Sequence, residues 1–115
     1  PDVDAFQGRM VPGAPLTDAP VHHEGRDTWL LRSLGQEFTL LVFGDAPAWS
    51  ASLSNVTVLR LGKDILDAQG LVAQRLDASP GSAYLIRPDQ HVCARWRRFD
   101  AAAVQAALRR ALGLH

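Results

Sequence analysis

Cysteine is almost absent from this chain. Cys93 is the only one among 115 residues. A single thiol can form neither an internal disulfide nor a zinc site built from several thiolates. A reducing compartment suits such a chain, so we expect a cytoplasmic location.

Excess charge and long apolar runs are lacking too. Lys and Arg together number 12, as do Asp and Glu, so the charge balance indicates no nucleic-acid or membrane partner. No apolar run approaches the roughly 20 residues that a membrane-spanning helix needs, and no charged start precedes an apolar signal region. The first residue is Pro1 rather than Met, which we interpret as a chain processed or excised from a longer protein.

What remains is the composition of one globular domain preceded by an irregular segment. Hydrophobic residues make up 47% of the chain, which is enough for a core at this length. Residues 1–26 hold four prolines and three glycines in no regular period, which predicts an extended arm or linker. We expect this arm to pack against another domain, and residues 27–115 to form the folded domain.

The hydrophobic pattern of residues 27–115 alternates between helices and strands. It predicts helices over 27–34, 65–76 and 100–112, a short helical piece within 46–55, and strands over 37–43, 56–61, 82–87 and 91–97. A crossover between the first two strands makes them parallel, and the last two form an antiparallel hairpin. The order predicts an α/β fold of the thioredoxin-like class, with a central mixed sheet of about four strands flanked by helices.

Thiol redox chemistry, which such a fold suggests, has no residues to carry it. The reactive cysteine pair would follow the first central strand, where the sequence reads Gly44-Asp45-Ala46-Pro47-Ala48-Trp49. Cys93 instead falls within a predicted strand, on the face of Arg95 and Arg97 and opposite Val92, Ala94 and Trp96. We interpret Cys93 as a small apolar filler; a reactive thiol is the alternative.

Other polar groups give no catalytic, cofactor or metal site. Adjacent His22 and His23 point apart in an extended chain, so they do not chelate easily with Glu24. The cluster around Arg95, Trp96 and Arg97 predicts an exposed strand edge or a contact to a neighbouring domain. Trp29 and Trp49 flank the first central strand, and we interpret these large apolar side chains as core or domain-interface residues rather than cofactor stackers. The candidate domain or subunit interface therefore comprises Trp29, Trp49, Arg95, Trp96 and Arg97.

Several segments resemble the tail of flavin-dependent aromatic-ring hydroxylases of the phenol hydroxylase and 3-(3-hydroxyphenyl)propionate hydroxylase type. The segment LIRPDQHVCARW, residues 85–96, is similar to their RPD-x-HVAWR hairpin, although Cys93-Ala94-Arg95 makes it longer than usual. Residues 8–13, GRMVPG, are similar to a G-x-R-x-PG arm. Residues 38–41, FTLL, are similar to a GFTLL strand, with Glu37 in place of the glycine.

The resemblance implies a non-catalytic carboxyl-terminal domain. The parent enzyme would bind FAD, oxidise NAD(P)H and use O2 to hydroxylate a phenolic ring. Its flavin and substrate sites would lie in amino-terminal domains, the expected partners of this one, since no G-x-G-x-x-G occurs here. The domain itself would serve packing or subunit contact, with a homodimer as one possibility and no cofactor of its own.

Two other interpretations stay open. One is a free-standing, redox-inactive thioredoxin-like module that binds a protein partner. The other, a peroxiredoxin-like enzyme with one cysteine, needs a nucleophilic thiol at a helix start, whereas Cys93 is predicted to lie within a strand.

Overall fold

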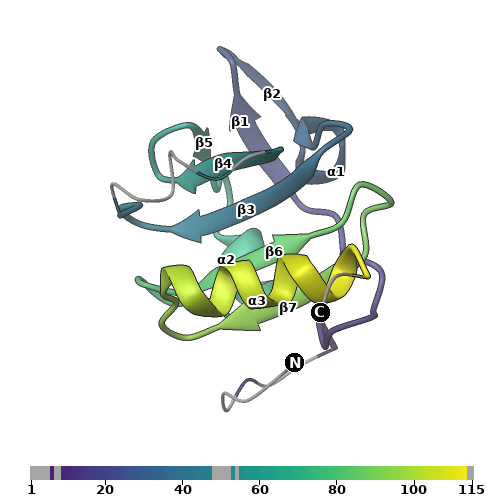
Figure 1. Ribbon diagram of the computed structural model, residues 1–115. Coiled ribbons are helices and arrows are strands. Elements are labelled where there is room, and N and C mark those ends of the chain that lie inside the picture. Colours follow the sequence, from purple (N-terminus) through teal and green to yellow (C-terminus); the bar gives the residue numbers. More distant parts are fainter. Residues whose placement is uncertain (1–5, 7–8, 48–52, 54, 114–115) are drawn as a thin grey trace.

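The protein is built around one mixed sheet. The computed structural model describes residues 6, 9–47, 53 and 55–113, and within them seven strands lie in the order β2-β1-β5-β4-β3-β6-β7 (Figure 1). The strands are β1 (Pro20–His23), β2 (Arg26–Trp29), β3 (Phe38–Phe43), β4 (Val56–Leu61), β5 (Ile65–Leu66), β6 (Ala83–Ile86) and β7 (Val92–Trp96). The β3–β4 and β4–β5 pairs are parallel and the others antiparallel.

Three helices accompany the sheet: α1 (Leu30–Ser33), α2 (Leu71–Leu76) and α3 (Ala101–Ala111). No helix of the described part is long and apolar enough to cross a membrane. The α/β class is therefore confirmed. The estimate of about four strands is wrong, because β1, β2 and β5 extend the sheet beyond β4.

The sheet separates two hydrophobic cores. Neighbouring residues of β3 alternate between its faces, so Leu41 lies in one core and Leu40 in the other. The first core lies under α1 and α2 and includes Tyr84, Leu30 and Leu76. The second core lies under α3, which crosses in front of β6 and β7 in Figure 1. A strand buried on both faces explains why residues 38–43 are almost wholly apolar.

Helix α3 agrees with its prediction. Its stripe of apolar residues buries Val104 and Ala107 against the second core. Asp100 is the N-cap, and its Oδ1 accepts a hydrogen bond of 2.8 Å from the backbone N–H of Ala103.

The predicted helix over 27–34 is wrong in its first half. Residues 26–29 form β2, which pairs with β1. Strand β1 lies within residues 1–26, for which the sequence predicts an extended arm. Glu24 and Gly25 join the two strands, with φ of +54° and +80°. Two successive positive φ values are typical of the tight hairpin turns that match strand twist. Only Leu30–Ser33 is helical, as α1.

The predicted helix over 65–76 is shorter than expected, because its first two residues form β5. Gly70 adopts φ +71° and precedes α2 without a capping side chain. Asp67 takes over that role: its carboxylate accepts hydrogen bonds from the N–H groups of Val72 (3.0 Å) and Ala73 (2.9 Å). The short helix predicted within 46–55 falls mostly outside the described residues.

The β6–β7 hairpin carries a bulge. Its turn lies over Pro88-Asp89-Gln90, between the two predicted strands, and is closed by a 2.9 Å hydrogen bond from Gln90 N–H to Arg87 O. Leu85 pairs with Ala94, but Ile86 pairs with Val92, so Cys93 is an extra residue on β7. The prediction that Val92, Ala94 and Trp96 share a face is therefore wrong: Val92 lies in the first core and the other two in the second.

Candidate functional site

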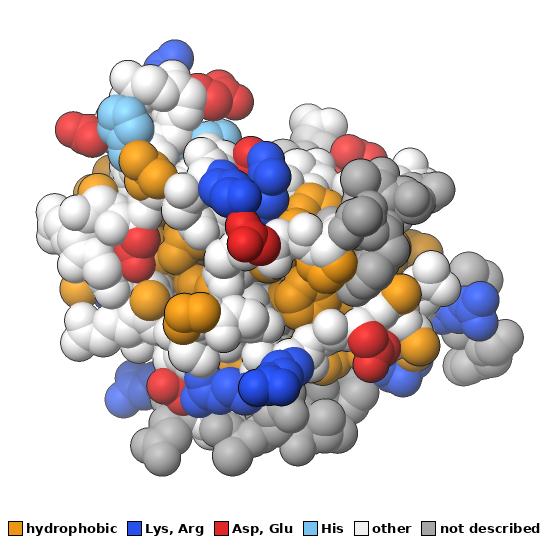
Figure 2. Space-filling model, turned by 90° about the vertical axis from the view of Figure 1, so that its left-hand side faces the viewer, with side chains coloured by type: hydrophobic (Ala, Val, Ile, Leu, Met, Phe, Trp, Pro, Cys, Tyr) orange, Lys and Arg blue, Asp and Glu red, His pale blue; other side chains and the backbone are white. Residues whose placement is uncertain are grey.

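The carboxyl ends of β3 and β4 are the first place to look for a site, since ligands of parallel sheets bind beyond those ends. Both strands run toward the left of Figure 1, so their ends face the viewer in Figure 2. A hollow of about 280 Å³ lies here, lined by Phe43, Gly44, Leu61, Ala73, Ala78, Ser79 and Pro80. Its lining has no titratable side chain and suits an apolar contact rather than bond-making chemistry.

Ion pairs flank this end of the sheet. Lys63 Nζ lies 2.7 Å from Asp45 Oδ1, and the pKa of Asp45 is lowered by the hydrogen bond and then by the charge of Lys63. Arg60 Nε lies 2.8 Å from Asp64 Oδ2, and hydrogen bonds from its side chain are the main reason that the pKa of Asp64 falls to about 2. Figure 2 shows such blue and red side chains beside apolar ones. Both carboxylates are therefore ionised acceptors, without an acid–base role near neutral pH.

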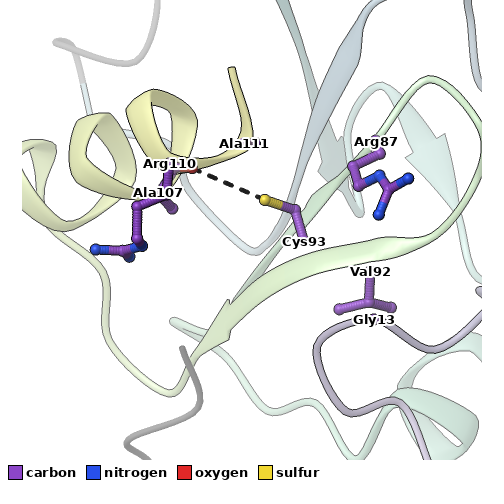
Figure 3. Close-up of a pocket in the computed structure, with 7 residues that line it drawn as sticks. All are labelled: Gly13, Arg87, Val92, Cys93, Ala107, Arg110 and Ala111. Atoms are coloured by element: carbon purple, nitrogen blue, oxygen red, sulfur yellow. Dashed lines mark hydrogen bonds between the residues drawn. The ribbon is translucent and has the colours of Figure 1, made fainter. Parts of the chain in front are cut away.

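A second pocket, of about 440 Å³, surrounds the thiol. It is lined by Gly13, Arg87, Val92, Cys93, Ala107, Arg110 and Ala111 (Figure 3). Cys93 is half-buried on β7, and its Sγ points at α3, 4.0 Å from the carbonyl oxygen of Ala107. Burial raises the pKa of this thiol, although Arg87 and Arg110 act in the opposite direction. Because the thiolate is the nucleophile, this environment disfavours reactivity.

The two arginines of this pocket do not converge on the thiol. Arg87 forms an ion pair with Asp89 across the hairpin turn. The guanidinium of Arg110, from the last turn of α3, points away from Cys93 in Figure 3. No group of three or more His, Cys, Asp or Glu in the described part of the chain could hold a metal ion.

The basic cluster of β7 is not the exposed edge that the sequence predicted. Arg95 is 2% exposed and Trp96 5% exposed. Trp96 packs into the second core, whereas Arg95 and Arg97 lie on the other side, with their Cζ atoms 4.6 Å and 4.1 Å from the ring centroid of Phe6. The prediction is wrong because Phe6 covers Arg95 on one face of the strand, whereas the second core under α3 buries Trp96 on the other. Whether any of these three side chains contacts another domain stays a prediction.

The remaining candidates are scattered. Trp29 ends β2 and is 47% exposed, and Trp49 lies outside the described residues. His22 pairs with Asp27 across the β1–β2 hairpin at 3.1 Å, and His23 lies 3.8 Å from Glu24, so the two histidines contact different carboxylates. Their separation agrees with the sequence analysis.

Sequence reasoning missed the importance of Phe6 and Tyr84. Tyr84 is fully buried and donates a hydrogen bond to the carbonyl oxygen of Leu76 at the end of α2. Phe6 packs edge-on against it, with centroids 5.7 Å apart. The one signal for Phe6 is that it is an aromatic residue within a segment otherwise dominated by Pro, Gly and polar residues.

Comparison with known proteins assigns the domain. A family model described as aromatic-ring hydroxylase, C-terminal, matches residues 7–114. The chain belongs to this family. The resemblance found in the hairpin and the central strand is thus confirmed at the level of the family, whose members are FAD-dependent monooxygenases.

Two solved structures of the hydroxylase family are similar over most of the chain. The first is the flavin-dependent monooxygenase PieE in complex with FAD and substrate, with a TM-score of 0.82 at 25% identity. The match covers 96% of this chain and 21% of the PieE chain. The second is aklavinone-11 hydroxylase in a ternary complex with FAD and aklavinone, with a TM-score of 0.70 at 28% identity. This match covers 84% of this chain and 20% of the hydroxylase chain. A search of curated proteins found no match.

The chain spans about a fifth of the length of these two enzymes. Four-fifths of each solved chain therefore lies outside the part that this hydroxylase domain resembles. Both solved enzymes hold FAD, whereas FAD binding by this domain is a separate question.

Proposed function

We propose that this chain is the non-catalytic carboxyl-terminal domain of a flavin-dependent monooxygenase that hydroxylates phenolic substrates with NAD(P)H and O2. FAD, nicotinamide and substrate bind to amino-terminal domains of the parent chain, and this domain serves packing or subunit contact, including a possible homodimer. The observation that carries the proposal is the family match over residues 7–114, together with coverage of only about a fifth of two FAD-containing relatives.

The character of the candidate sites supports a non-catalytic role. The hollow at the ends of β3 and β4 is apolar, and the pKa of the one thiol is raised by burial. Neither arrangement provides a poised acid, base or nucleophile. A cytoplasmic location remains part of the proposal, because a chain with one cysteine suits a reducing compartment.

We also propose that the fold is thioredoxin-like. The strand order β4-β3-β6-β7, with β3 and β4 parallel and the other two pairs antiparallel, supports this assignment. The extra strands β1, β2 and β5 are additions at one edge. The part of residues 1–26 that precedes β1 joins the domain to the parent, and Trp29 and Arg97 are candidate contacts of this domain with other domains.

Two measurements test the proposal. The reading frame upstream of Pro1 should encode several hundred residues with a G-x-G-x-x-G motif after a strand. The purified chain, mixed with FAD, NADPH and phenol, should oxidise NADPH at the background rate, and the full-length protein should oxidise it with consumption of O2. Turnover by the isolated chain would contradict a non-catalytic role.

A free-standing protein-binding module is the second candidate. The exposed Trp29 and the apolar hollow favour it, because both offer contact area to a partner. A start codon just upstream of Pro1 would support this candidate and exclude the first.

A further inference from the structure

The amino-terminal segment packs against the folded domain. Three backbone hydrogen bonds tie it to the β6–β7 hairpin: Gly13 N–H to Val92 O (2.7 Å), Val92 N–H to Ala14 O (2.8 Å) and Leu16 N–H to Gln90 O (2.8 Å). Further toward the start, Met10 is 9% exposed within the first core. The segment is thus already attached between residues 10 and 16.

Phe6 extends this attachment to the far end of β7. Its ring meets Tyr84 edge-on, with an interplanar angle of 77°, and the two guanidinium groups of Arg95 and Arg97 lie over it. Tyr84 and Arg95 are paired directly across β6 and β7, and residues 95 and 97 are two positions apart and so share a face. The sheet therefore presents a site for one aromatic ring.

The site is held in shape by contacts that do not involve Phe6. Arg97 Nη2 lies 2.6 Å from Asp77 Oδ2, and Arg97 also donates to the backbone oxygen of Asp77, which ends α2. The hydroxyl of Tyr84 donates to Leu76, one residue earlier. Aromatic and cationic groups fixed in this way attract the face and edge of a ring more than an aliphatic side chain of equal size.

We propose that Tyr84, Arg95 and Arg97 form a docking site for the aromatic ring of Phe6, which anchors the chain that precedes the domain. Phe6 acts as a positioning residue: its ring holds the amino-terminal segment against Tyr84, Arg95 and Arg97. Any consequence for a flavin-binding part rests on the proposed function, because that part would precede the anchored residue in the parent chain. The anchoring itself does not depend on it.

Trypsin provides a direct assay on the purified 115-residue chain. Arg9 is exposed and lies between Phe6 and Met10, so the Arg9–Met10 bond is cleaved when this segment opens. When opening is fast relative to cleavage, the rate reports the population of the open form. Loss of two guanidinium contacts and one ring contact in Phe6→Ala should raise the rate at this bond on the order of tenfold.

Matched variants separate the ring from mere bulk. Phe6→Tyr should keep the wild-type rate and Phe6→Leu should be intermediate. Val11→Ala, which trims a 45% exposed apolar residue of the same segment, should change nothing. Equal rates for Phe6→Ala and wild type would overturn the anchor, and equal rates for Phe6→Leu and wild type would overturn the role of the guanidinium groups. Mass spectrometry identifies the cleaved bond, and no flavin is needed, so the result stands apart from the proposed function.

Discussion

At the scale of single residues, Cys93 shows how position decides reactivity. The thiol sits between β7 and α3, and burial raises its pKa. We expect its reaction with a disulfide reagent at pH 8 to be at least about tenfold slower than that of the urea-unfolded chain, because the thiolate is the reacting form. Stopped-flow absorbance measures both rates. Faster reaction in the folded chain would mean that Arg87 and Arg110 dominate.

Asp64 should make the free energy of unfolding depend on pH in acid. Its pKa is about 2 in the folded protein and close to 3.9 in an unfolded chain, so the folded state binds fewer protons between these values. The stabilisation is complete above about pH 4 and is lost as the pH falls toward 2. Asp64→Asn should show a shallower decline of the free energy of unfolding over that window. Urea titrations between pH 2 and 5 measure it, and parallel curves would refute the effect.

The burial of Arg95 marks the limit of sequence reasoning for single residues. An Arg-Trp-Arg run on a strand indicates a solvated edge when only neighbours along the chain are considered. The burial of Arg95 comes with Phe6, 89 positions away, and with the strand pairing to Tyr84. No pattern within one window of the sequence carries that information.

At the scale of elements, α2 depends on a residue outside it. Asp67 accepts hydrogen bonds from the second and third N–H groups of this helix. Asp67→Ala should lower the free energy of unfolding by about 1 kcal/mol, as for the loss of other capping side chains. Urea denaturation measures the change. Asp67→Asn keeps an acceptor and is the control, which should lose less; equal losses would point to charge rather than hydrogen bonding.

Long or strongly periodic elements could be predicted, and short ones could not. Strand β3 and helix α3 have apolar patterns that predict them from neighbouring residues alone. Strand β1 begins at Pro20 and β2 is polar, so neither has a strand pattern of its own. They form because the Glu24-Gly25 turn pairs them and β5 joins β1 to β4, which leaves β2 at the edge of the sheet. Pairing of this kind is set by the tertiary fold.

At the scale of the whole molecule, both cores share one sheet. Leu76 belongs to the first core and Val104 to the second, and both are fully buried. Leu76→Ala should cost about 2–5 kcal/mol and Val104→Ala about 2 kcal/mol. Because β3 serves both cores, each variant should retain a single unfolding transition.

Circular dichroism in the near and far ultraviolet tests this cooperativity. The two signals should change at the same urea concentration in both variants. Leu112→Ala, at a residue that is 60% exposed, is the control and should match the wild type. Separate transitions for the two spectral regions would show that the cores unfold independently.

The bulge on β7 has a consequence for comparing this domain with its relatives. Cys93 is an extra residue on this strand, so Val92 lies in the first core and Ala94 in the second although they are only two positions apart. An alignment that places its gap anywhere else in the hairpin would equate positions that face the first core with positions that face the second. Residue roles transferred from other hydroxylases to this hairpin are therefore sound only when the insertion is assigned to position 93.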